Sequence, residues 1–323
     1  MKAMILVAKD QPLMYEDIEM PITEAGEILV ELKAAALNHR DVWIQKGLYA
    51  GIKYPAILGS DGSGKTLDGR HVVLNPSLNW GPNPHVQGKS YTILGLPTDG
   101  TFAEYVKVPV ENVFDKPSHL NFEEAAAFPL AGLTAFRVLF TKGHAVAGDR
   151  VLISGVGGGV ALMAMQLAIA AGCEVWVSSG SDEKIEKAKA MGAKGGINYK
   201  SEGWAKQLVA LSGGFDVIID SAVGDGFADL INICALPGGR VVFYGATSLG
   251  NIQGIKPAIV FWKQISIIGS TMGNPQEFAE MLKFVEKHQI KPVVDQVFAL
   301  QDANAAMKKM DEGKQFGKLV LAI

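Results

Sequence analysis

Residues 151–179, VLISGVGGGVALMAMQLAIAAGCEVWVSS, contain the pattern that decides the fold. The β-branched start at Val151 predicts a buried strand, and the glycines after it predict a tight turn. The apolar run that follows predicts a buried helix, which ends at Gly172. A further β-branched run then predicts a second strand. These parts form one βαβ unit, so we expect the two strands to be parallel.

The same stretch is long enough to be mistaken for a membrane span. Residues 151–173 carry no charge, and a transmembrane helix needs roughly 20 apolar residues. However, glycines interrupt the run, and the sequence contains no second span. The N-terminal residues do not resemble a secretory signal, and the two cysteines, Cys173 and Cys234, are too few for a disulfide framework. We therefore expect a soluble, cytoplasmic protein.

Around this unit, strands and helices continue to alternate. The sequence predicts strands at EVWVSS, GGINY, FDVIID, GRVVFYG and QISIIGS, with helices between most of them. This alternation is typical of an α/β fold, a parallel sheet covered by helices. Before about residue 117 the chain consists instead of short predicted strands separated by glycine and proline, which indicates a β-rich domain. A helix with the capping residues Asn121 and Glu124, interrupted at Pro129, lies between the two parts.

One motif suggests a different function. Residues 58–66, LGSDGSGKT, fit the phosphate-loop pattern, in which a glycine-rich turn leads directly into a helix. Here residues 68–69 predict a hairpin turn and residues 71–74 predict a strand, so no helix follows Lys65. FDVIID is then a strand of the parallel sheet rather than a magnesium-holding strand. We interpret residues 58–66 as a glycine-rich loop between strands.

The turn inside the βαβ unit is a candidate dinucleotide site. In parallel sheets, ligands bind beyond the carboxyl ends of the strands, where glycines let the backbone approach a pyrophosphate. The glycines are spaced as Gly-x-x-Gly-x-x-Ala, because valine stands at the sixth position of the usual G-x-G-x-x-G pattern. The residues expected to contact the cofactor are Gly155, Gly157, Gly158, Gly159 and Val160.

The end of the second strand favours NADPH over NAD. NAD-selective sites place a carboxylate there, which binds the ribose diol. This chain has Ser178 and Ser179 at that position, followed by Lys184. Hydroxyls and an ammonium bind a 2′-phosphate, which a carboxylate would repel. Two alternatives stay open: Ser181 acts only as a helix cap, and Lys184 is a solvated surface residue.

Charge argues against two classes of partner. The formal net charge is −3, and the Lys and Arg residues are scattered along the chain rather than clustered. Neither nucleic acid nor an anionic membrane is therefore an expected partner. A small-molecule substrate is the partner that we expect.

The order of the parts resembles a known family. The β-rich start, the segment AGLTAF, the turn SGVGGGVA and the end GKLVLAI are similar to the medium-chain dehydrogenase/reductase superfamily over essentially the whole chain. The resemblance implies a GroES-like catalytic domain at residues 1–117, completed by about 288–323, and a doubly wound Rossmann domain for NADP at 118–287. Members hold the cofactor between these domains. The glycine spacing is most similar to the zinc-free, quinone oxidoreductase-like branch.

The same resemblance implies that no zinc is bound. Zinc-type members carry Cys, Gly-His-Glu and a further Cys or Asp at the positions that match Asn38, residues 59–61 and Ala131 here. The single acid left at these positions cannot assemble the three-ligand site that catalysis requires. The segment that matches the structural-zinc lobe, residues 75–95, contains no cysteine. His39 has no second histidine at ligand spacing, so we expect a surface or packing role for it.

Other site residues follow from matched positions. Asn38 is expected to bind the substrate carbonyl or the nicotinamide ribose, Tyr49 to donate a proton or hydrogen bond, and Trp43 to line the pocket. Core packing is the alternative for both aromatic residues. On the cofactor side, the resemblance implies Thr134 at the nicotinamide, Tyr199 at the 2′-phosphate, and Gly245, Ser270, Thr271 and Lys318 near the cofactor.

Without a metal, the oxidation of simple alcohols loses the usual means of stabilising an alkoxide. Hydride transfer to an electrophilic acceptor remains feasible, because conjugation delocalises the negative charge. We therefore expect a zinc-independent, NADPH-dependent reductase of quinones or α,β-unsaturated carbonyls. The alternatives are an NADPH-binding redox sensor or crystallin-like protein with little turnover, and an alcohol dehydrogenase-like enzyme. The flat, apolar strand QISIIGS also predicts a homodimer.

Overall fold

The computed structural model describes residues 1–248 and 251–323, which form two compact units. The first unit comprises Met1–Ala131 and Gly273–Ile323, and the second comprises Gly132–Met272. The chain enters the second unit within helix α3 (Pro129–Phe136). The expected domain boundaries, 117/118 and 287/288, both fall inside the first unit.

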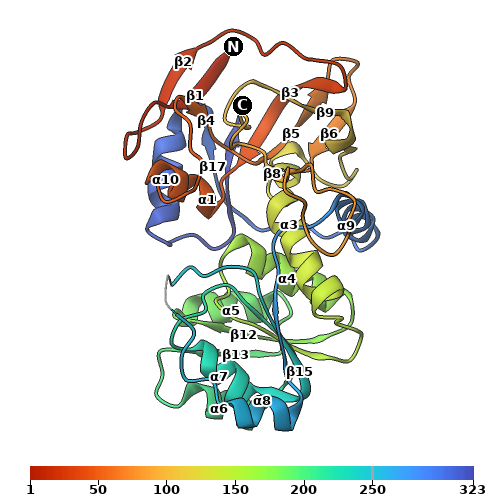
Figure 1. Ribbon diagram of the computed structural model, residues 1–323, viewed down its shortest axis with the longest axis vertical. Helices are drawn as coiled ribbons and strands as arrows, with labels where there is room; N and C mark the ends of the chain where they lie inside the picture. The colour runs from red at the N-terminus through yellow and green to blue at the C-terminus, as the bar shows by residue number, and fades with distance from the viewer. Residues whose placement is uncertain (249–250) are drawn as a thin grey trace. The chain divides into compact units, whose positions relative to one another are not determined.

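The first unit is built on a seven-stranded, mostly antiparallel sheet (Figure 1). Its main path runs β10 (Val113–Asp115), β6 (His71–Leu74), β5 (Asp61–Thr66), β3 (Glu27–Ala36), β18 (Lys318–Ala322), β17 (Val294–Ala299), with β9 (Tyr105–Pro109) also paired to β3. Smaller sheets contain β1 (Lys2–Leu6), β2 (Met14–Asp17) and β4 (Ala56–Ile57), and β7 (Ser77–Leu78) and β8 (Thr92–Ile93). The sheet thus brings the C-terminal strand β18 beside β3, as the antiparallel pairing shows.

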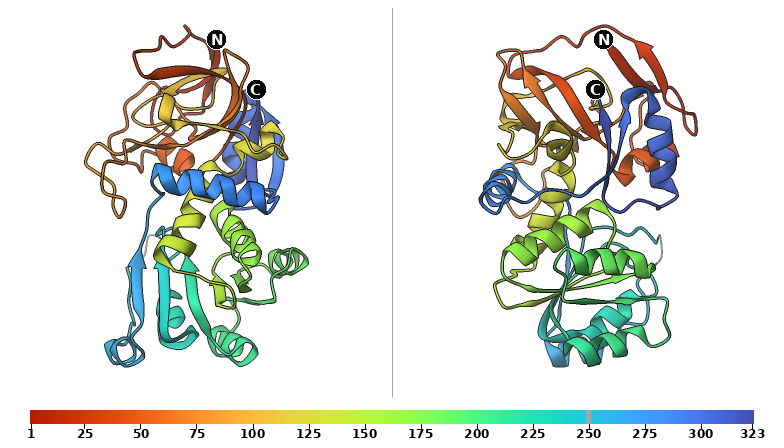
Figure 2. Two further views of the ribbon diagram at one scale, coloured as in Figure 1. Left: turned by 90° about the vertical axis from the view of Figure 1, so that its right-hand side faces the viewer. Right: turned by 180° about the vertical axis from the view of Figure 1, so that it is seen from behind.

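Four α-helices and two 3₁₀ turns accompany these sheets. They are α1 (His39–Gln45), α2 (Phe122–Ala126), α9 (Pro275–Lys287), α10 (Ala303–Asp311), η1 (Val110–Asn112) and η4 (Leu300–Asp302). Helix α10 lies against α1 (Figure 2). Helix α2 begins with the predicted capping box, in which the Asn121 side chain accepts from the Glu124 N–H.

Packing explains why the unit boundaries differ from the expected ones. Ala126 and Ala127, at the end of α2, pack in one buried cluster with Ala34 and Ala36 of β3. On α9, the ring of Phe278 lies 5.0 Å from that of Phe114 in β10. Both helices therefore bury their apolar faces on the β-rich unit. The helical pattern of the sequence therefore begins at α2, before the chain leaves the first unit, so it does not mark the boundary between the units.

The glycine-rich stretch at 58–66 differs from the expected loop. Residues 61–66 form the central strand β5, paired with β3 and β6. A Cβ on Gly64 would lie 2.0 Å from the carbonyl oxygen of Glu31, so this register requires a glycine. No helix follows Lys65; the chain turns at Gly69 into β6, as predicted. The fold therefore excludes a phosphate loop at residues 58–66. The prediction that these residues form a loop was wrong, because residues 61–66 are a strand.

The second unit contains a six-stranded, fully parallel sheet, which confirms the predicted α/β architecture. Its order is β13 (Gly195–Asn198), β12 (Glu174–Ser179), β11 (Arg150–Ile153), β14 (Phe215–Asp220), β15 (Ala235–Phe243), β16 (Ser266–Gly269). The chain starts in the middle, moves to one edge, then returns and moves to the other edge. This order is that of a doubly wound dinucleotide-binding fold. FDVIID is β14, the fourth strand in chain order, as predicted.

Helices cover both faces of this sheet. Helices α4 (Gly159–Ala170) and α5 (Asp182–Ala190) lie on one face, whereas α6 (Trp204–Ser212), α7 (Phe227–Asp229) with the π-helical η3 (Leu230–Cys234), and α8 (Pro257–Lys263) lie on the other (Figure 1). A second π-helical segment, η2 (Arg137–Lys142), continues α3. The charge-free run at 151–173 contains most of β11, the glycine turn and α4, and α4 buries most of its apolar residues in the unit. Among the helices of the described residues, none combines the length and apolarity that crossing a bilayer requires.

Candidate functional site

The turn between β11 and α4 has the backbone form that a dinucleotide site requires. Gly155 has a φ of 64° and Gly157 a φ of 133°, conformations that residues with a Cβ rarely adopt. A Cβ on Gly158 would meet no atom within 4 Å, so the outer side of the turn is open. Gly158 is also the N-cap of α4 and offers no side chain to its first N–H groups. These donors are therefore available to an anion such as a pyrophosphate.

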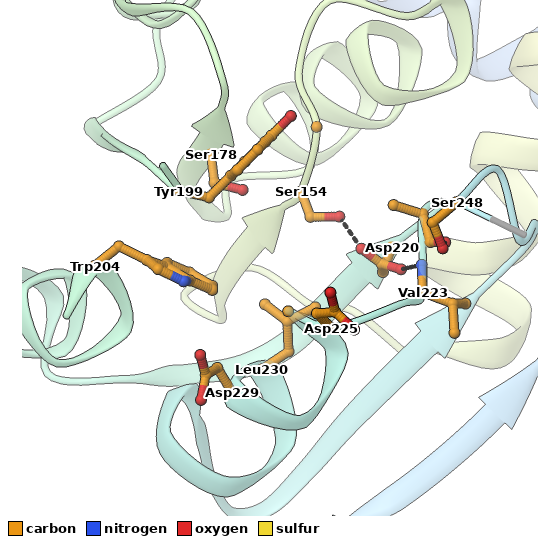
Figure 3. A pocket seen from close by; sticks show the side chains of 13 residues that line it. Ser154, Ser178, Tyr199, Trp204, Asp220, Val223, Asp225, Asp229, Leu230 and Ser248 are labelled. Carbon is orange, nitrogen blue, oxygen red and sulfur yellow. Dashed lines mark hydrogen bonds between the residues drawn. The ribbon is translucent and has the colours of Figure 1, made fainter. Parts of the chain in front are cut away.

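A cavity of about 520 Å³ opens at the carboxyl ends of β11, β12 and β14 (Figure 3). Three of the predicted cofactor residues line it: Gly155, Ser178 and Tyr199. Trp204, from the start of α6, adds a second aromatic side chain to the lining. The cavity is therefore at the position where parallel sheets bind nucleotides, and it presents flat apolar surfaces that suit a purine ring.

Asp220, at the end of β14, organises the floor of this cavity and was not among the predicted site residues. The Ser154 hydroxyl and the Val223 N–H, the latter at 2.7 Å, both donate to its carboxylate (Figure 3). Burial raises the pKa of Asp220, whereas these hydrogen bonds oppose the rise. Asp220 thus ties the turn after β14 to the end of β11. The available signal was an acid at the end of a buried apolar strand.

The end of β12 has the arrangement on which the cofactor preference depends. Ser178 and Ser179 are both buried there, and the Tyr199 N–H donates to the Ser179 carbonyl at 3.1 Å. A Cβ on Gly180 would lie 2.8 Å from both the Tyr199 hydroxyl and Cε of Lys200. Tyr199 and Lys200 therefore flank the strand end. Lys200 was missed, because its proximity to this end appears only once β13 is paired with β12.

Lys184 lies close to the glycine turn. A Cβ on Gly157 would be 2.8 Å from Cδ of Lys184 and 3.3 Å from its Nζ. The neighbouring acids are engaged elsewhere: Asp182 accepts from Asn198 at 2.9 Å, and Glu183 pairs with Lys187 at 2.7 Å. The alternative role of Ser181 as a helix cap is borne out, since its hydroxyl accepts from the Lys184 N–H. Capping by Ser181 leaves the ammonium of Lys184 beside the turn.

Four more of the predicted cofactor residues lie in the second unit: Thr134, Gly245, Ser270 and Thr271. Thr134 is buried, and its hydroxyl contacts the sulfur of Met272 at 3.7 Å, which places it beside the segment that contains Ser270 and Thr271. The Ser270 N–H donates to the Phe243 carbonyl at 2.9 Å. Gly245 follows β15, where a Cβ would lie 3.0 Å from the Ser221 carbonyl oxygen.

In the first unit, Lys318 connects Asn38 with Asp61. The Lys318 ammonium donates to Oδ1 of Asn38 at 2.7 Å and to Oδ2 of Asp61 at 3.0 Å. The Asn38 amide also donates to Oδ2 of Asp61 at 2.9 Å, and the Leu130 N–H donates to its other oxygen at 2.8 Å. All three side chains are buried. Lys318, predicted near the cofactor, therefore acts on the side chain of Asn38.

Arg40 and Asp41 extend this group. The Arg40 guanidinium donates through Nη1 to the Ser60 hydroxyl at 2.6 Å and to the Leu94 carbonyl at 2.9 Å. The Asp41 carboxylate accepts from the Asn38 N–H at 2.8 Å. Burial raises the pKa of Asp41 to about 6, although the nearby Arg40 charge lowers it. We call the six residues of this group the buried polar cluster: Asn38, Arg40, Asp41, Ser60, Asp61 and Lys318.

The two aromatic residues predicted at the substrate lie beside the cluster on the α1 segment. Tyr49 is half-buried and packs on the apolar core of the first unit, with the Arg40 guanidinium 5.2 Å from the centre of its ring. Trp43 is also half-buried, and its ring centre is 6.4 Å from that of His39. Core packing, the alternative role, therefore applies at least in part to Tyr49.

The cluster does not suit a zinc ion. Asn38 and Asp61, at two of the positions that match zinc ligands, are held by the Lys318 ammonium, and Ser60 at a third is held by Arg40. A divalent cation there would face two buried positive charges. Nor do three His, Cys, Asp or Glu side chains converge on a possible metal position anywhere in residues 1–248 or 251–323.

Comparisons with known proteins identify the family. Residues 24–118 match the alcohol dehydrogenase GroES-like domain, and residues 159–287 match the zinc-binding dehydrogenase family. A zinc-type alcohol dehydrogenase-like protein of Leptosphaeria maculans is 35% identical, over 97% of this chain and 95% of its own. The chain belongs to the medium-chain dehydrogenase/reductase superfamily.

Two further relatives carry different functional descriptions. The quinone oxidoreductase of Mus musculus is 28% identical, over 96% of this chain and 93% of its own. A crystal structure described as an NAD-dependent alcohol dehydrogenase is 36% identical, covers both chains completely and has a TM-score of 0.93. The family is one of pyridine-nucleotide-dependent oxidoreductases, and the open glycine turn and the cavity of this chain fit such a dinucleotide.

Proposed function

We propose that the protein is a zinc-independent, NADPH-dependent reductase of quinones or α,β-unsaturated carbonyls. The observation that carries this proposal is the contact between the Lys318 ammonium and both Asn38 and Asp61. A fixed organic cation stands where zinc-type relatives are expected to place a metal. Oxidation of a simple alcohol passes through an alkoxide, which a Lewis acid such as zinc normally stabilises. Reduction of a conjugated acceptor does not need this Lewis acid, because conjugation delocalises the negative charge.

The preference for NADPH rests on the end of β12. Buried serines stand at the position where an NAD-selective carboxylate belongs, and Lys184 and Lys200 lie close to the strand end and the glycine turn. Ammonium groups stabilise a 2′-phosphate through charge-assisted hydrogen bonds. One solved relative is described as NAD-dependent, so both NADPH and NADH should be tested as cofactors.

The two units divide the chemistry in this proposal. A bound NADPH supplies the hydride. The second unit holds the pyrophosphate on the N-terminal N–H groups of α4 and the adenosine in the cavity beside Tyr199 and Trp204. The first unit holds the acceptor by hydrogen bonds from Asn38 and Tyr49. Lys318 fixes the Asn38 amide in one orientation, with Oδ1 towards the ammonium. One N–H of Nδ2 then donates to Asp61, and its second N–H is the donor to the acceptor in this proposal.

A homodimer is part of the proposal. Among the described residues, no strand pairs with the outer side of β16, which is an edge of the parallel sheet. Helix α8, which precedes it, buries none of its residues and leaves Phe261 and Trp262 70% and 81% exposed. A second copy, related by a two-fold axis, covers both features at once by pairing β16 with β16.

The proposed function is tested by following NADPH oxidation at its near-ultraviolet absorbance with a panel of quinones, enals and enones. NADH replaces NADPH in one control, and a zinc chelator is added in another. Turnover that prefers NADPH and ignores the chelator is the expected result. Binding of NADPH without turnover on any acceptor would point instead to a binding or sensor protein. Stoichiometric zinc in the purified protein would contradict the metal-free site.

A further inference from the structure

Arg40 is a buried cation whose hydrogen-bonding capacity is not filled. The residue is only 7% exposed, yet its Nε is buried and has no hydrogen-bond partner among the residues that the structure describes. The contacts that it does make, through Nη1, are with two uncharged oxygens, of Ser60 and Leu94. A buried charge is normally paired, because its desolvation is otherwise uncompensated.

Lys318 provides the contrast within the same cluster. Its ammonium is 3.0 Å from the Asp61 carboxylate, so the two charges neutralise each other by direct contact. Among the described residues, Arg40 takes part in no such ion pair. Burial raises the pKa of Asp41 and the charge of Arg40 opposes that rise, but the Asp41 oxygens accept from the N–H groups of Asn38 and Gly59 rather than from the guanidinium. Arg40 is therefore the cation of the cluster that has no direct carboxylate contact among the described residues.

Tyr49 limits where that charge acts. The guanidinium carbon lies 5.2 Å from the centre of the Tyr49 ring, in cation–π contact. The Nη1 of Arg40 is held by its hydrogen bond to the Ser60 hydroxyl, and Ser60 precedes Asp61 in the chain. The guanidinium is thus held between the phenol of Tyr49 and the turn that carries Ser60 and Asp61. A planar guanidinium held in this way can donate to an oxyanion without reorganising.

We propose that Arg40 binds the oxygen of the acceptor and stabilises the negative charge that it gains during reduction. This inference rests on the proposed function. As hydride from NADPH forms a C–H bond at the β-carbon of the enone or at a ring carbon of the quinone, the π electrons move to the conjugated oxygen, giving an enolate, and NADPH becomes NADP⁺. Water then supplies one proton, and the protonated quinone adduct tautomerises to the hydroquinone. Arg40 acts before that proton arrives, in place of a Lewis acid.

The kinetic test compares R40M with R40K and with the control R70M. Arg70 is another arginine of the first unit, but it is half-exposed and pairs with Asp115 at the surface. R40M is expected to lower kcat with 1,4-benzoquinone and 2-cyclohexenone on the order of a hundredfold, with a much smaller change in KM. R40K keeps the positive charge but lacks the planar guanidinium, so its kcat is expected to lie between those of R40M and the wild type. Unchanged kcat in R40M would overturn the proposal.

A binding test uses the wild-type protein and does not depend on turnover. The probe is 4-nitrophenol, which ionises near neutral pH and changes colour as it does so. With NADP⁺ present, the wild type is expected to bind the phenolate in preference to the phenol, so the bound dye ionises at a lower pH than the free dye. Equal binding of the two forms would overturn the proposal.

The two tests also separate this inference from the proposed function. If the wild type reduces the acceptors and R40M does so equally well, the inference alone fails. If the wild type has no turnover, the proposed function fails, and the dye titration of the wild type beside R40M still decides whether Arg40 binds an oxyanion. If R40M does not fold, as judged by circular dichroism, the wild-type dye titration and R40K decide the question.

Discussion

The ammonium of Lys318 lies 3.0 Å from the carboxylate of Asp61, and the two side chains are only 5% and 0% exposed. The residues are 257 positions apart in the chain, so the contact ties the C-terminal strand β18 to β5. Both side chains are therefore almost completely shielded from water. Each charge therefore depends on the other, because an isolated charge in this environment is strongly unfavourable.

Removing Lys318 should therefore destabilise the protein strongly. K318M leaves Asp61 buried without its counter-ion and is expected to lower the free energy of unfolding by about 3–5 kcal/mol. Urea denaturation followed by tryptophan fluorescence measures this difference. Lys314 provides the control, because it pairs with Glu312 at 2.7 Å on the surface. K314M should leave the unfolding midpoint unchanged, and equal effects of the two variants would contradict the assignment.

The raised pKa of Asp41 predicts a stability that falls as the pH rises. Burial raises the pKa of this carboxyl from 3.8 to about 6 in the folded protein. Below pH 4 the carboxyl is protonated in both states. Between pH 4 and 6 the unfolded chain binds fewer protons than the folded one, so the free energy of unfolding decreases with pH. Above pH 6 both states are ionised and the loss is complete.

The variant D41N isolates this contribution from the other carboxyl groups. At about 1.4 kcal/mol per pKa unit, wild type should lose about 3 kcal/mol relative to D41N between pH 4 and pH 7. Guanidinium denaturation at several pH values measures the difference. D41N also loses one hydrogen-bond acceptor, but that effect does not vary with pH. A difference that is constant over this range would show that Asp41 is ionised throughout.

Lys184 should discriminate between the two cofactors. K184M removes an ammonium beside the glycine turn and is expected to raise the Kd for NADPH about tenfold, since a hydrogen bond to a charged group contributes about 1.5–3 kcal/mol. The Kd for NADH should stay the same, because NADH lacks the 2′-phosphate. Cofactor fluorescence measures both constants. K187M is the matched control on the same helix, since Lys187 pairs with Glu183. Equal losses for both cofactors in K184M would place Lys184 elsewhere on the dinucleotide.

The parallel sheet could be predicted from the sequence because its signals are local. Most of its strands contain a short apolar run, and the turn at Gly155 and Gly157 needs glycine for its positive φ values. The chemistry at the end of β12 was also visible, because Ser178 and Ser179 are adjacent in the chain. Lys200 was not, because it reaches this end only through the pairing of β13 with β12.

The buried polar cluster could not be assembled from the sequence. Lys318 and Asn38 are 280 positions apart, and no periodicity relates them. Arg40 gave no signal either, since one arginine in an otherwise ordinary segment resembles a surface residue until its burial is known. Strand β5 was missed for a related reason. Glycine and serine disfavour strands locally, and only the close approach of β3 explains why Gly64 is needed there.

That close approach makes Gly64 a sharp test of the register of β5. A Cβ in G64A would lie 2.0 Å from the Glu31 carbonyl oxygen, and backbone atoms cannot move away without breaking the β3–β5 pairing. We expect a loss of at least about 3 kcal/mol in the free energy of unfolding. G69A is the control, because Gly69 has a φ of 89° but open space around it. Its left-handed conformation should cost about 1–2 kcal/mol, and a larger loss in G69A than in G64A would contradict this register.

The proposed dimer predicts that one exposed tryptophan controls association. Trp262 on α8 is 81% exposed and precedes the edge strand β16, so W262E would bury a charge in the interface. Sedimentation equilibrium should give a dimer for the wild type and a monomer for W262E at micromolar concentrations. L211E is the control, because Leu211 is 65% exposed on α6, away from the sheet edge formed by β16. If L211E alone dissociates the protein, the interface lies on α6; if the wild type is monomeric, the exposed edge of β16 stays unpaired in solution and the dimer proposal fails.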